Sequence, residues 1–386
     1  MSFPVLYAPS TMDFDNNGIG ILSDCSSCFV TEERNGAFDL VMDYPTDGIH
    51  FEEITYDCII KAQLERGRKP QLFRVYYINK PMFGVVNIKA NHISYDLSGI
   101  TIKPFFALDL GQTMQSLKTN LPSAAYSDED AAKWAGRFSF AFDESMQTSS
   151  KDFEIKVPAS IRSVLGGLEK NILSTYGGEF EFDNFDVVLH EERGEDNGVS
   201  IAYGKNLTNL QQEINCSSYA TAVYPFWAKE EENGEITLVT MGESVQLTEA
   251  ELYRDIWFRK VIPLDLTEEF DEQPSVEELS AAADVYVLEN NIGKPSVSLS
   301  LTYSQLQQTE EYRDGQILDR VMLCDMVSVK FPALGVSTKA KVTKIVYDVL
   351  RERVDSAVVG SVKMDIADTI SAQGKAIDAL KKSVRT

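Results

Sequence analysis

Residues 158–207 constrain the fold of this chain more than any other segment, because apolar residues there change from helical to strand spacing. Pro158 suits the first turn of a helix. Apolar residues follow at three- and four-residue steps: Ile161, Val164, Leu165, Leu168 and Ile172. This spacing predicts one helix with one buried face, ended by Gly177-Gly178, where a left-handed residue is needed.

Three strands are predicted after this helix. Phe180 and Phe182 alternate with glutamates, Asp183-Asn184 turns the chain, and a second alternating run follows: Phe185, Val187 and Leu189. An acidic turn from Gly194 to Gly198 precedes a third run: Val199, Ile201 and Tyr203. The pattern predicts a helix over a small antiparallel meander.

Length and composition indicate an ordinary globular chain. Its 386 residues, 44% hydrophobic and 25% charged, are enough for two to four domains with real cores. No apolar run of about 18 residues exists, so no membrane-spanning helix is expected. The N-terminus, MSFPVLYAPSTMDFDNN, lacks a basic region followed by an apolar core, so no secretory signal is expected.

The charge is strongly acidic, with 36 Lys and Arg against 59 Asp and Glu, a formal net charge of −23. Specific nucleic-acid binding through a basic surface is therefore not expected. An acidic wall could instead let DNA slide past without sticking, and solubility alone is the simpler explanation.

Five cysteines, an odd number, predict reduced thiols in a protein made in a cytoplasm. Cys25 and Cys28 have the spacing of a redox or zinc pair, but no second such pair exists and the three histidines supply no spaced partners. An incidental pair in a strand or turn is the favoured interpretation.

Residues 1–100 are predicted to be rich in strands. After the turn Asn35-Gly36, apolar residues alternate with polar ones: Phe38, Leu40, Met42 and Tyr44. The strand QLFRVYYINK (71–80) follows the basic loop RGRK (66–69), and VVNIKANHISYDLSG (85–99) closes the region. His92 is interpreted as a structural histidine, because no nucleophile or metal-ligand set surrounds it in sequence.

Two groups of segments resemble the phage minor structural proteins of siphophage and prophage tails, also called the prophage endopeptidase tail or tail-associated lysin family. These are GGEFEFDN followed by VVLHEERGEDNGVSIAYGKNL, and, earlier in the chain, the FRV strand and HISYDL. The resemblance covers roughly residues 20–365 and implies a baseplate hub. Such a hub is a homotrimer whose two β-barrels per chain give six units that match the distal tail protein ring. It closes the tail tube and opens for DNA and the tape-measure protein.

The second half of the chain is predicted to return to strands. TAVYPFWA (221–228) and EITLVTMG (235–242) flank an acidic hairpin tip, and Thr248 to Glu251 and Ser275 to Glu278 have capping-box spacing. Residues 295–360 are again predicted to be strands, and within them the layout L-x-D-x-V-x-V (323–329), a short loop and KVTKIVYDVL (341–350) resemble the last barrel strands of the family. Cys324 stands where that resemblance implies a small residue, often glycine, which leaves the local turn open.

The C-terminal segment has a heptad pattern. Apolar residues and one glutamine step by four and three: Ile366, Ile370, Gln373, Ile377, Leu380 and Val384. This seam predicts a helix that self-associates, as at the start of a trimeric stalk carrying a fibre or lysin. A terminal helix packed on its own domain is the alternative.

Chemistry-bearing motifs are few. Asp13, Asp15 and Asn17, with Asp24 in the twelfth position, match only part of a calcium loop, so an Asx-rich turn is favoured over a metal site. His190-Glu191-Glu192 lacks the second histidine of a zinc-protease motif. No nucleophile, phosphate-binding or dinucleotide motif is present, so neither a catalytic site nor a cofactor is expected. In the family the endopeptidase is a separate, later domain, and we expect either that it is absent here or that the sequence was truncated before it.

The sequence therefore predicts an α+β, mostly β chain with two hub-type antiparallel barrels. The first barrel comprises 1–100 and about 200–230, and the second 231–261 and 295–362. A lateral α/β domain spans 101–199, an acidic linker and helical insertion spans 262–294, and a C-terminal helix spans 363–386. The favoured hypothesis is a structural protein of the virion tail tip, made in the bacterial host cytoplasm. The alternatives are a peptidoglycan hydrolase and a carbohydrate-binding adhesin.

Overall fold

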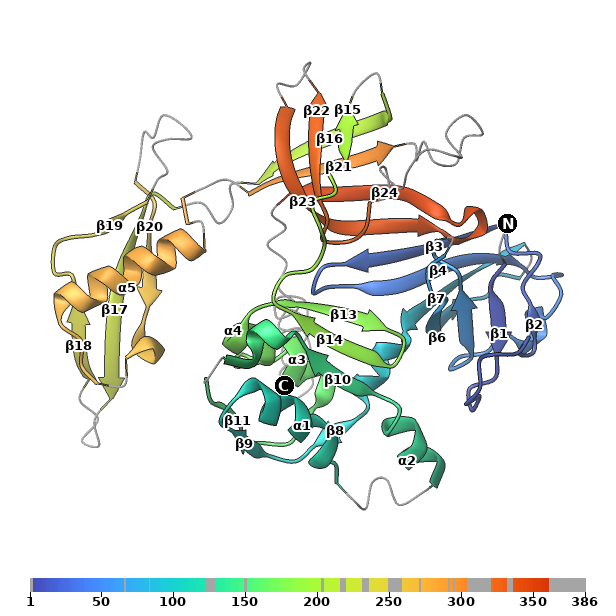
Figure 1. The fold of residues 1–386 in the computed structure, drawn as a ribbon, viewed down its shortest axis with the longest axis horizontal. Coiled ribbons are helices and arrows are strands. Elements are labelled where there is room, and N and C mark those ends of the chain that lie inside the picture. Colours follow the sequence, from blue (N-terminus) through green and yellow to red (C-terminus); the bar gives the residue numbers. More distant parts are fainter. Residues whose placement is uncertain are drawn as a thin grey trace. The chain divides into compact units, whose positions relative to one another are not determined.

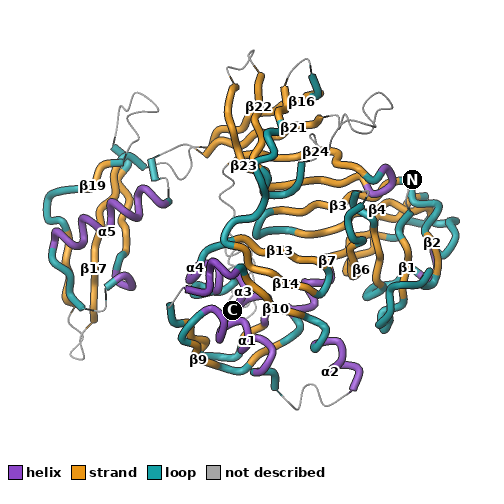
Figure 2. Tube along the Cα trace, in the orientation of Figure 1, coloured by secondary structure: helices purple, strands orange, loops and turns teal. Residues whose placement is uncertain are grey.

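The computed structural model of this protein divides the chain into two compact units. Unit 1 comprises Met1–Gln211 with Leu299–Thr386, and unit 2 comprises Gln212–Ser298. The structure describes residues 3–65, 67–82, 84–122, 129–148, 151–202, 205–215, 220–230, 236–248, 259–270, 272–290, 292–293, 296–303, 321–331 and 336–360. Strands predominate in both units (Figure 2), which confirms the prediction of a mostly β chain.

A large mixed sheet forms the body of unit 1 (Figure 1). Its strands follow the order β16-β21-β24-β23-β3-β4-β7-β6-β5-β1-β2, and β22 pairs with both β23 and β15. Their bounds are β1 Val5–Tyr7, β2 Gly20–Ile21, β3 Ser27–Glu33, β4 Phe38–Pro45, β5 Ile59–Ala62, β6 Gln71–Asn79, β7 Val85–His92, β15 Ser200–Ala202, β16 Leu207–Asn215, β21 Ser296–Tyr303, β22 Met326–Phe331, β23 Val336–Asp348 and β24 Arg353–Gly360. Because β3 pairs with β23, strands from the two predicted barrel regions share one continuous sheet.

The N-terminal strands follow the predicted alternation. In β4 every second residue is buried: Phe38, Leu40, Met42 and Tyr44. Asn35 has a left-handed backbone (φ 52°), as its predicted turn before Gly36 requires. The alternating apolar residues of β4 therefore form part of the core of unit 1, as the sequence predicts.

Residues 101–199 form an α/β segment within unit 1, with helices against small sheets (Figure 1). Its strands are β8 Thr101–Ile102, β9 Phe105–Ala107, β10 Ser139–Phe142, β11 Phe153–Ile155, β12 Ala159–Ser160, β13 Glu179–Asp183 and β14 Asp186–His190. Its helices are α1 Leu110–Thr119, α2 Glu129–Ala135, α3 Ile161–Gly166 and α4 Ile172–Tyr176. Phe180, Val187 and Leu189 are buried in the core of unit 1, as the alternation predicts.

The predicted single helix at 158–176 is wrong, because it is two short helices. Gly167 ends α3, where its N–H donates to the Ser163 carbonyl. Asn171 and Ser174 then form a capping box that starts α4. The predicted helix end is confirmed, since Gly177 and Gly178 both have positive φ.

The predicted three-strand meander is also wrong in its third strand. β13 and β14 form the expected hairpin, but the third strand of that sheet is β10, which pairs with β14 in parallel. β15 instead leaves the segment and pairs in parallel with β22 of the large sheet. Strand alternation identifies strands and their faces but not their partners.

Unit 2 is a four-stranded sheet with one long helix across it (Figure 1). Its elements are β17 Ala222–Glu230, β18 Ile236–Thr240, β19 Gln246–Leu247, β20 Val261–Asp265 and α5 Val276–Glu289. Leu279 and Ala283 of α5 are buried with Val223 and Trp227 of β17. The Ser275–Glu278 capping box that starts α5 is confirmed.

This division differs from the predicted domains, which grouped 231–261 with 295–362. β18, β19 and β20 all pair with β17, and all lie in unit 2 with α5. The predicted C-terminal helix and its heptad seam lie outside the described residues. Short 3₁₀ turns complete the fold: η1 Phe51–Glu53, η2 Ile93–Ser98, η3 Glu144–Thr148, η5 Thr267–Glu269 and η9 Val349–Arg351. No helix in the described part of the chain has the length and apolar character needed to cross a membrane.

Candidate functional site: the polar junction

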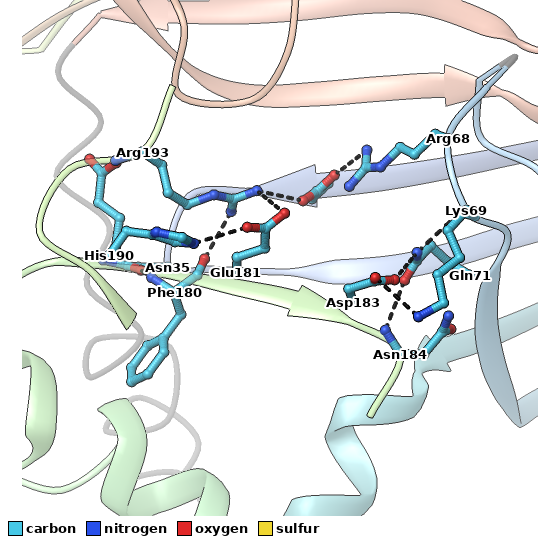
Figure 3. A network of polar contacts seen from close by, with 12 residues as sticks. Asn35, Arg68, Lys69, Gln71, Phe180, Glu181, Asp183, Asn184, His190 and Arg193 are labelled. Atoms are coloured by element: carbon cyan, nitrogen blue, oxygen red, sulfur yellow. Dashed lines mark hydrogen bonds and ion pairs between the residues drawn. The ribbon is translucent and has the colours of Figure 1, made fainter. Parts of the chain in front are cut away.

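Charged side chains gather where the β13–β14 hairpin lies against the large sheet of unit 1 (Figure 3). We call this cluster the polar junction. Its members are Glu32, Arg34, Arg68, Asp143, Glu179, Glu181, His190, Arg193, Lys341 and Tyr347. They come from β3, β13, β14, β23 and the connecting loops, so the cluster exists only once distant parts of the chain have met.

Glu32 is the most buried charge in the junction, with 3% of its surface exposed. Its Oε2 accepts a hydrogen bond from Arg68 Nη1 at 3.0 Å, and Arg193 Nη2 lies 3.6 Å from its Oε1. Arg68 also donates to the Tyr347 hydroxyl at 2.8 Å. Burial alone would raise the pKa of Glu32, but the two guanidinium groups hold it below its ordinary value. Glu32 therefore stays ionised inside the protein.

Glu179 joins three elements. It accepts hydrogen bonds from the Arg193 backbone N–H at 2.8 Å, from Lys341 Nζ at 2.8 Å and from Arg34 Nη1 at 3.1 Å. Burial would raise the pKa of Glu179, but the Lys341 and Arg193 hydrogen bonds lower it overall. These contacts tie β13 to β23 and to the turn after β3.

His190 lies between two carboxylates. Its Nδ1 is 2.9 Å from Asp143 Oδ1, and its Nε2 is 2.9 Å from Glu181 Oε2. Both ring nitrogens are therefore engaged by carboxylates, one on each side. This geometry suits a bridge between the loop after β10 and strand β13 rather than a general base.

Two asparagines fasten the hairpin at both ends. Asn35 donates to the Gly178 carbonyl at 3.0 Å and accepts from the Phe180 N–H at 2.8 Å. Asn184 accepts from the Leu72 N–H at 2.8 Å and donates to the Pro70 carbonyl at 3.0 Å. Lys69 and Gln71 add bonds to Asp183 beside this second clamp (Figure 3). Both asparagines have positive φ, so two predicted turns also serve as clamps.

A polar cavity of about 630 Å³ opens beside the junction. Its lining includes Asp143, Glu191, Glu192 and Ser145, together with the ion-paired Arg34, Glu179 and Lys341. Lys341 bridges Glu179 and Glu192, the latter at 3.3 Å. Glu191 and Glu192 are solvent-exposed, and among the described residues no group of His, Cys, Asp and Glu is arranged to hold a metal ion.

The segment after the junction passes very close to the turn before β22. Gly194 has a φ of 79°, and a Cβ there would lie 2.2 Å from the carbonyl carbon of Cys324. Glu195 N–H donates to Asp325 Oδ1 at 2.9 Å, and its carbonyl accepts from Met326 at 3.0 Å. Cys324 itself has a φ of 73°, so the turn keeps the left-handed backbone although glycine is absent.

Two of the residues from the calcium-loop pattern, Asp13 and Asp24, accept hydrogen bonds from backbone N–H groups. The Asp15 N–H donates to Asp13 Oδ1 at 2.9 Å, which is an Asx turn. Asp24 Oδ2 accepts from the Ile49 N–H at 2.7 Å. Asn17 is exposed. Of these contacts, that of Asp13 is the kind an Asx-rich turn makes.

His92 is a structural histidine, as predicted. It is fully buried, stacks on Phe38 with ring centroids 4.1 Å apart, and contacts Gln71 and Ser94. Cys25 and Cys28 are buried, unbridged thiols, and burial first, followed by the neighbouring Cys25, raises the pKa of Cys28 well above its ordinary value. Neither observation points to chemistry at these residues.

The sequence did not predict the buried ion pairs, although it contains a signal for them. Glu32 occupies the buried face of β3, in step with Cys28 and Val30. A buried, ionised glutamate needs a cation beside it, because an unpaired charge inside a protein is costly. Arg68 of the basic RGRK loop is that cation.

Solved structures share this fold. Prophage tail protein gp18 from Listeria monocytogenes EGD-e aligns with a TM-score of 0.55 and 16% identity, covering 98% of this chain and 100% of that one. The 43 kDa tail protein of prophage MuSo2 from Shewanella oneidensis aligns with a TM-score of 0.59 and 14% identity, covering 94% and 98%. The fold is thus that of solved prophage tail proteins.

The family match is more specific. Residues 195–370 match the model of the family described as prophage endopeptidase tail. This match confirms the resemblance drawn from the sequence. No curated protein matches the chain.

Proposed function

We propose that this chain is a structural protein of the phage tail tip, a baseplate hub that works as a homotrimer. It docks on the distal tail protein ring, closes the tube, and opens for the tape-measure protein and DNA. The main support for the proposal is the polar junction. Its charged side chains bind one another and hold the β13–β14 hairpin on the large sheet of unit 1, which is a structural role. The family match and the shared fold support the same class of protein.

In this proposal the two predicted barrel regions face a channel, and the α/β segment lies lateral to it. The net charge of −23 suits a wall past which DNA slides without specific binding. A trimer with a basic lumen would contradict this part of the proposal. The heptad residues 366–384 then begin a trimeric stalk to a fibre or lysin.

The proposal describes a protein without enzymatic activity, localised to the virion tail tip after synthesis in the host cytoplasm. The alternative from another class is a peptidoglycan hydrolase, and the cavity with Asp143, Glu191 and Glu192 is the observation that keeps it testable. A carbohydrate-binding adhesin is the third candidate.

Two measurements separate these functions. Purified chain on gels containing host cell walls is expected to give no clearing, and sedimentation is expected to give a trimer, alone or on the partner ring. Clearing that is lost in Glu191→Gln or His190→Gln would establish the hydrolase instead. Binding to cell-wall glycan without trimer formation would favour the adhesin.

A further inference from the structure

Unit 2 leaves one face of its sheet uncovered by its own helix. α5 packs on the face that carries Val223 and Trp227. Ala222 and Ala228 alternate with Val223 and Trp227 along β17, so they lie on the opposite face. Paired residues share a face. Leu238, which pairs with Ala228, therefore lies on this opposite face, as do Leu247 and Val261, which both pair with Ala222. We call this opposite face the open sheet face. Four of its apolar side chains are exposed, namely Ile236 (68%), Leu238 (59%), Leu247 (50%) and Val261 (43%).

An apolar sheet face of this kind needs a partner, because a solvated sheet face normally carries polar residues. The net charge of unit 2 indicates which kind of partner can bind the open sheet face. Unit 2 has 18 Asp and Glu against five Lys and Arg, a net charge of −13 in 87 residues. Two open sheet faces placed back to back would bring two such charges together. The favoured partner is therefore apolar and basic.

Unit 1 exposes a surface with that chemistry. Residues 75–95 contain two cations, Lys80 and Lys89, and no Asp or Glu. The basic residues just before them, Arg68, Lys69 and Arg74, are paired with carboxylates of unit 1 and do not count toward this surface. The β6–β7 hairpin presents Tyr77, Met82 and Val85, with 44%, 87% and 51% of their surfaces exposed. We call these three residues, with Lys80 and Lys89, the hairpin patch.

The two lysines of the hairpin patch contact rings rather than carboxylates. Lys80 Nζ lies 5.0 Å from the ring centroid of Phe51, and Lys89 Nζ lies 5.3 Å from that of Tyr77. Within the described part of the chain neither lysine has an ion pair, so both can meet an acidic partner.

We infer that the open sheet face of one copy docks on the hairpin patch of a second copy. The two surfaces differ, so the contact is heterologous and can close a ring. This inference rests on the proposed homotrimer and names the surfaces that hold it together.

Cross-linking in the full chain tests the inference. In a Cys216→Ser background, Leu238→Cys and Tyr77→Cys chains with different tags are mixed and treated with a bismaleimide; the other four cysteines are buried. A mixed cross-linked dimer is expected. The matched control is Val285→Cys on α5, which is 53% exposed and should link to Tyr77→Cys at least tenfold less.

Point mutations test the same interface independently of cross-linking. Leu238→Ser and Lys89→Glu are each expected to weaken self-association tenfold or more in sedimentation, and Val285→Ser is expected to leave it unchanged. Equal linking through Val285→Cys, a link only within one chain, or no mixed link would overturn the inference. A trimer without the mixed cross-link would contradict this interface but not the proposed function. A chain that never forms a trimer would contradict both the interface and the proposed function.

Discussion

At the scale of single residues, two left-handed backbones, Gly194 and Cys324, lie so close together that a Cβ on Gly194 would meet the Cys324 backbone. A left-handed conformation costs a residue with a side chain about 1–2 kcal/mol, so Cys324 is held there by its surroundings. Its thiol is fully buried, and burial raises its pKa to about 12. The resemblance to the family implied a small residue here, and cysteine fills that role at the cost of strain.

Gly194→Ala is expected to destabilise unit 1 by about 3 kcal/mol, because the new Cβ meets backbone atoms of Cys324 and the left-handed φ adds strain. Gly198→Ala is the matched control, since its φ is 68° and no atom of the described residues lies within 4 Å of the place that a new Cβ would take. That change should cost about 1 kcal/mol. Denaturant unfolding of the two variants measures the difference, and equal losses would contradict the close approach.

His92 gives a pH prediction. Burial, aided by Arg162 and Arg68, lowers the pKa of His92 well below its ordinary value of 6.5. The unfolded chain then binds a proton that the folded chain does not, so stability falls as the pH drops below about 6.5. One such group contributes up to about 1.4 kcal/mol per pH unit. Between pH 7.5 and 5.5, His92→Gln should therefore lose less stability than the native chain, and identical losses would argue against a buried neutral histidine.

At the scale of elements, the sequence predicted strands and faces better than partners. The alternation of Phe38 to Tyr44 and of Phe180 to Leu189 marked the buried faces correctly. The pairing of β15 with β22 joins residues more than 120 positions apart, which no local pattern encodes. The break between α3 and α4 was missed because the apolar spacing continues through Leu168, while the Asn171 cap interrupts the backbone.

The polar junction makes its own prediction. Glu32→Gln should destabilise unit 1 by about 3–5 kcal/mol, because it leaves Arg68 and Arg193 buried without their shared counter-charge. Glu33→Gln is the control from the next position of β3. Its pair with Lys344, at 2.8 Å, is partly exposed, so its loss should cost about 0–1 kcal/mol. Thermal unfolding of both variants distinguishes them, and a small effect for Glu32→Gln would show that the junction does not fasten the hairpin.

At the scale of the whole molecule, each unit has its own core. The core of unit 1 contains Leu40 among many strand residues, and the small core of unit 2 centres on Trp227 and Leu279. The sequence predicted β17, β18 and the helix of unit 2 but assigned the elements of this unit to three different regions, with most of β20 placed in a linker. The grouping into units depends on the pairing of β17 with β18, β19 and β20. As with β15 and β22, the pairing of strands is a long-range property that local sequence patterns do not encode.

Two cores predict two unfolding transitions in calorimetry. Leu279→Ala removes a fully buried side chain from unit 2 and should lower only one transition, by about 2–4 kcal/mol. Leu40→Ala, equally buried in unit 1, should lower the other. If both variants shifted one common transition, the two units would unfold as a single cooperative body. A selective shift would instead mean that unit 2 keeps its own fold, so its open sheet face is already formed when a second copy arrives.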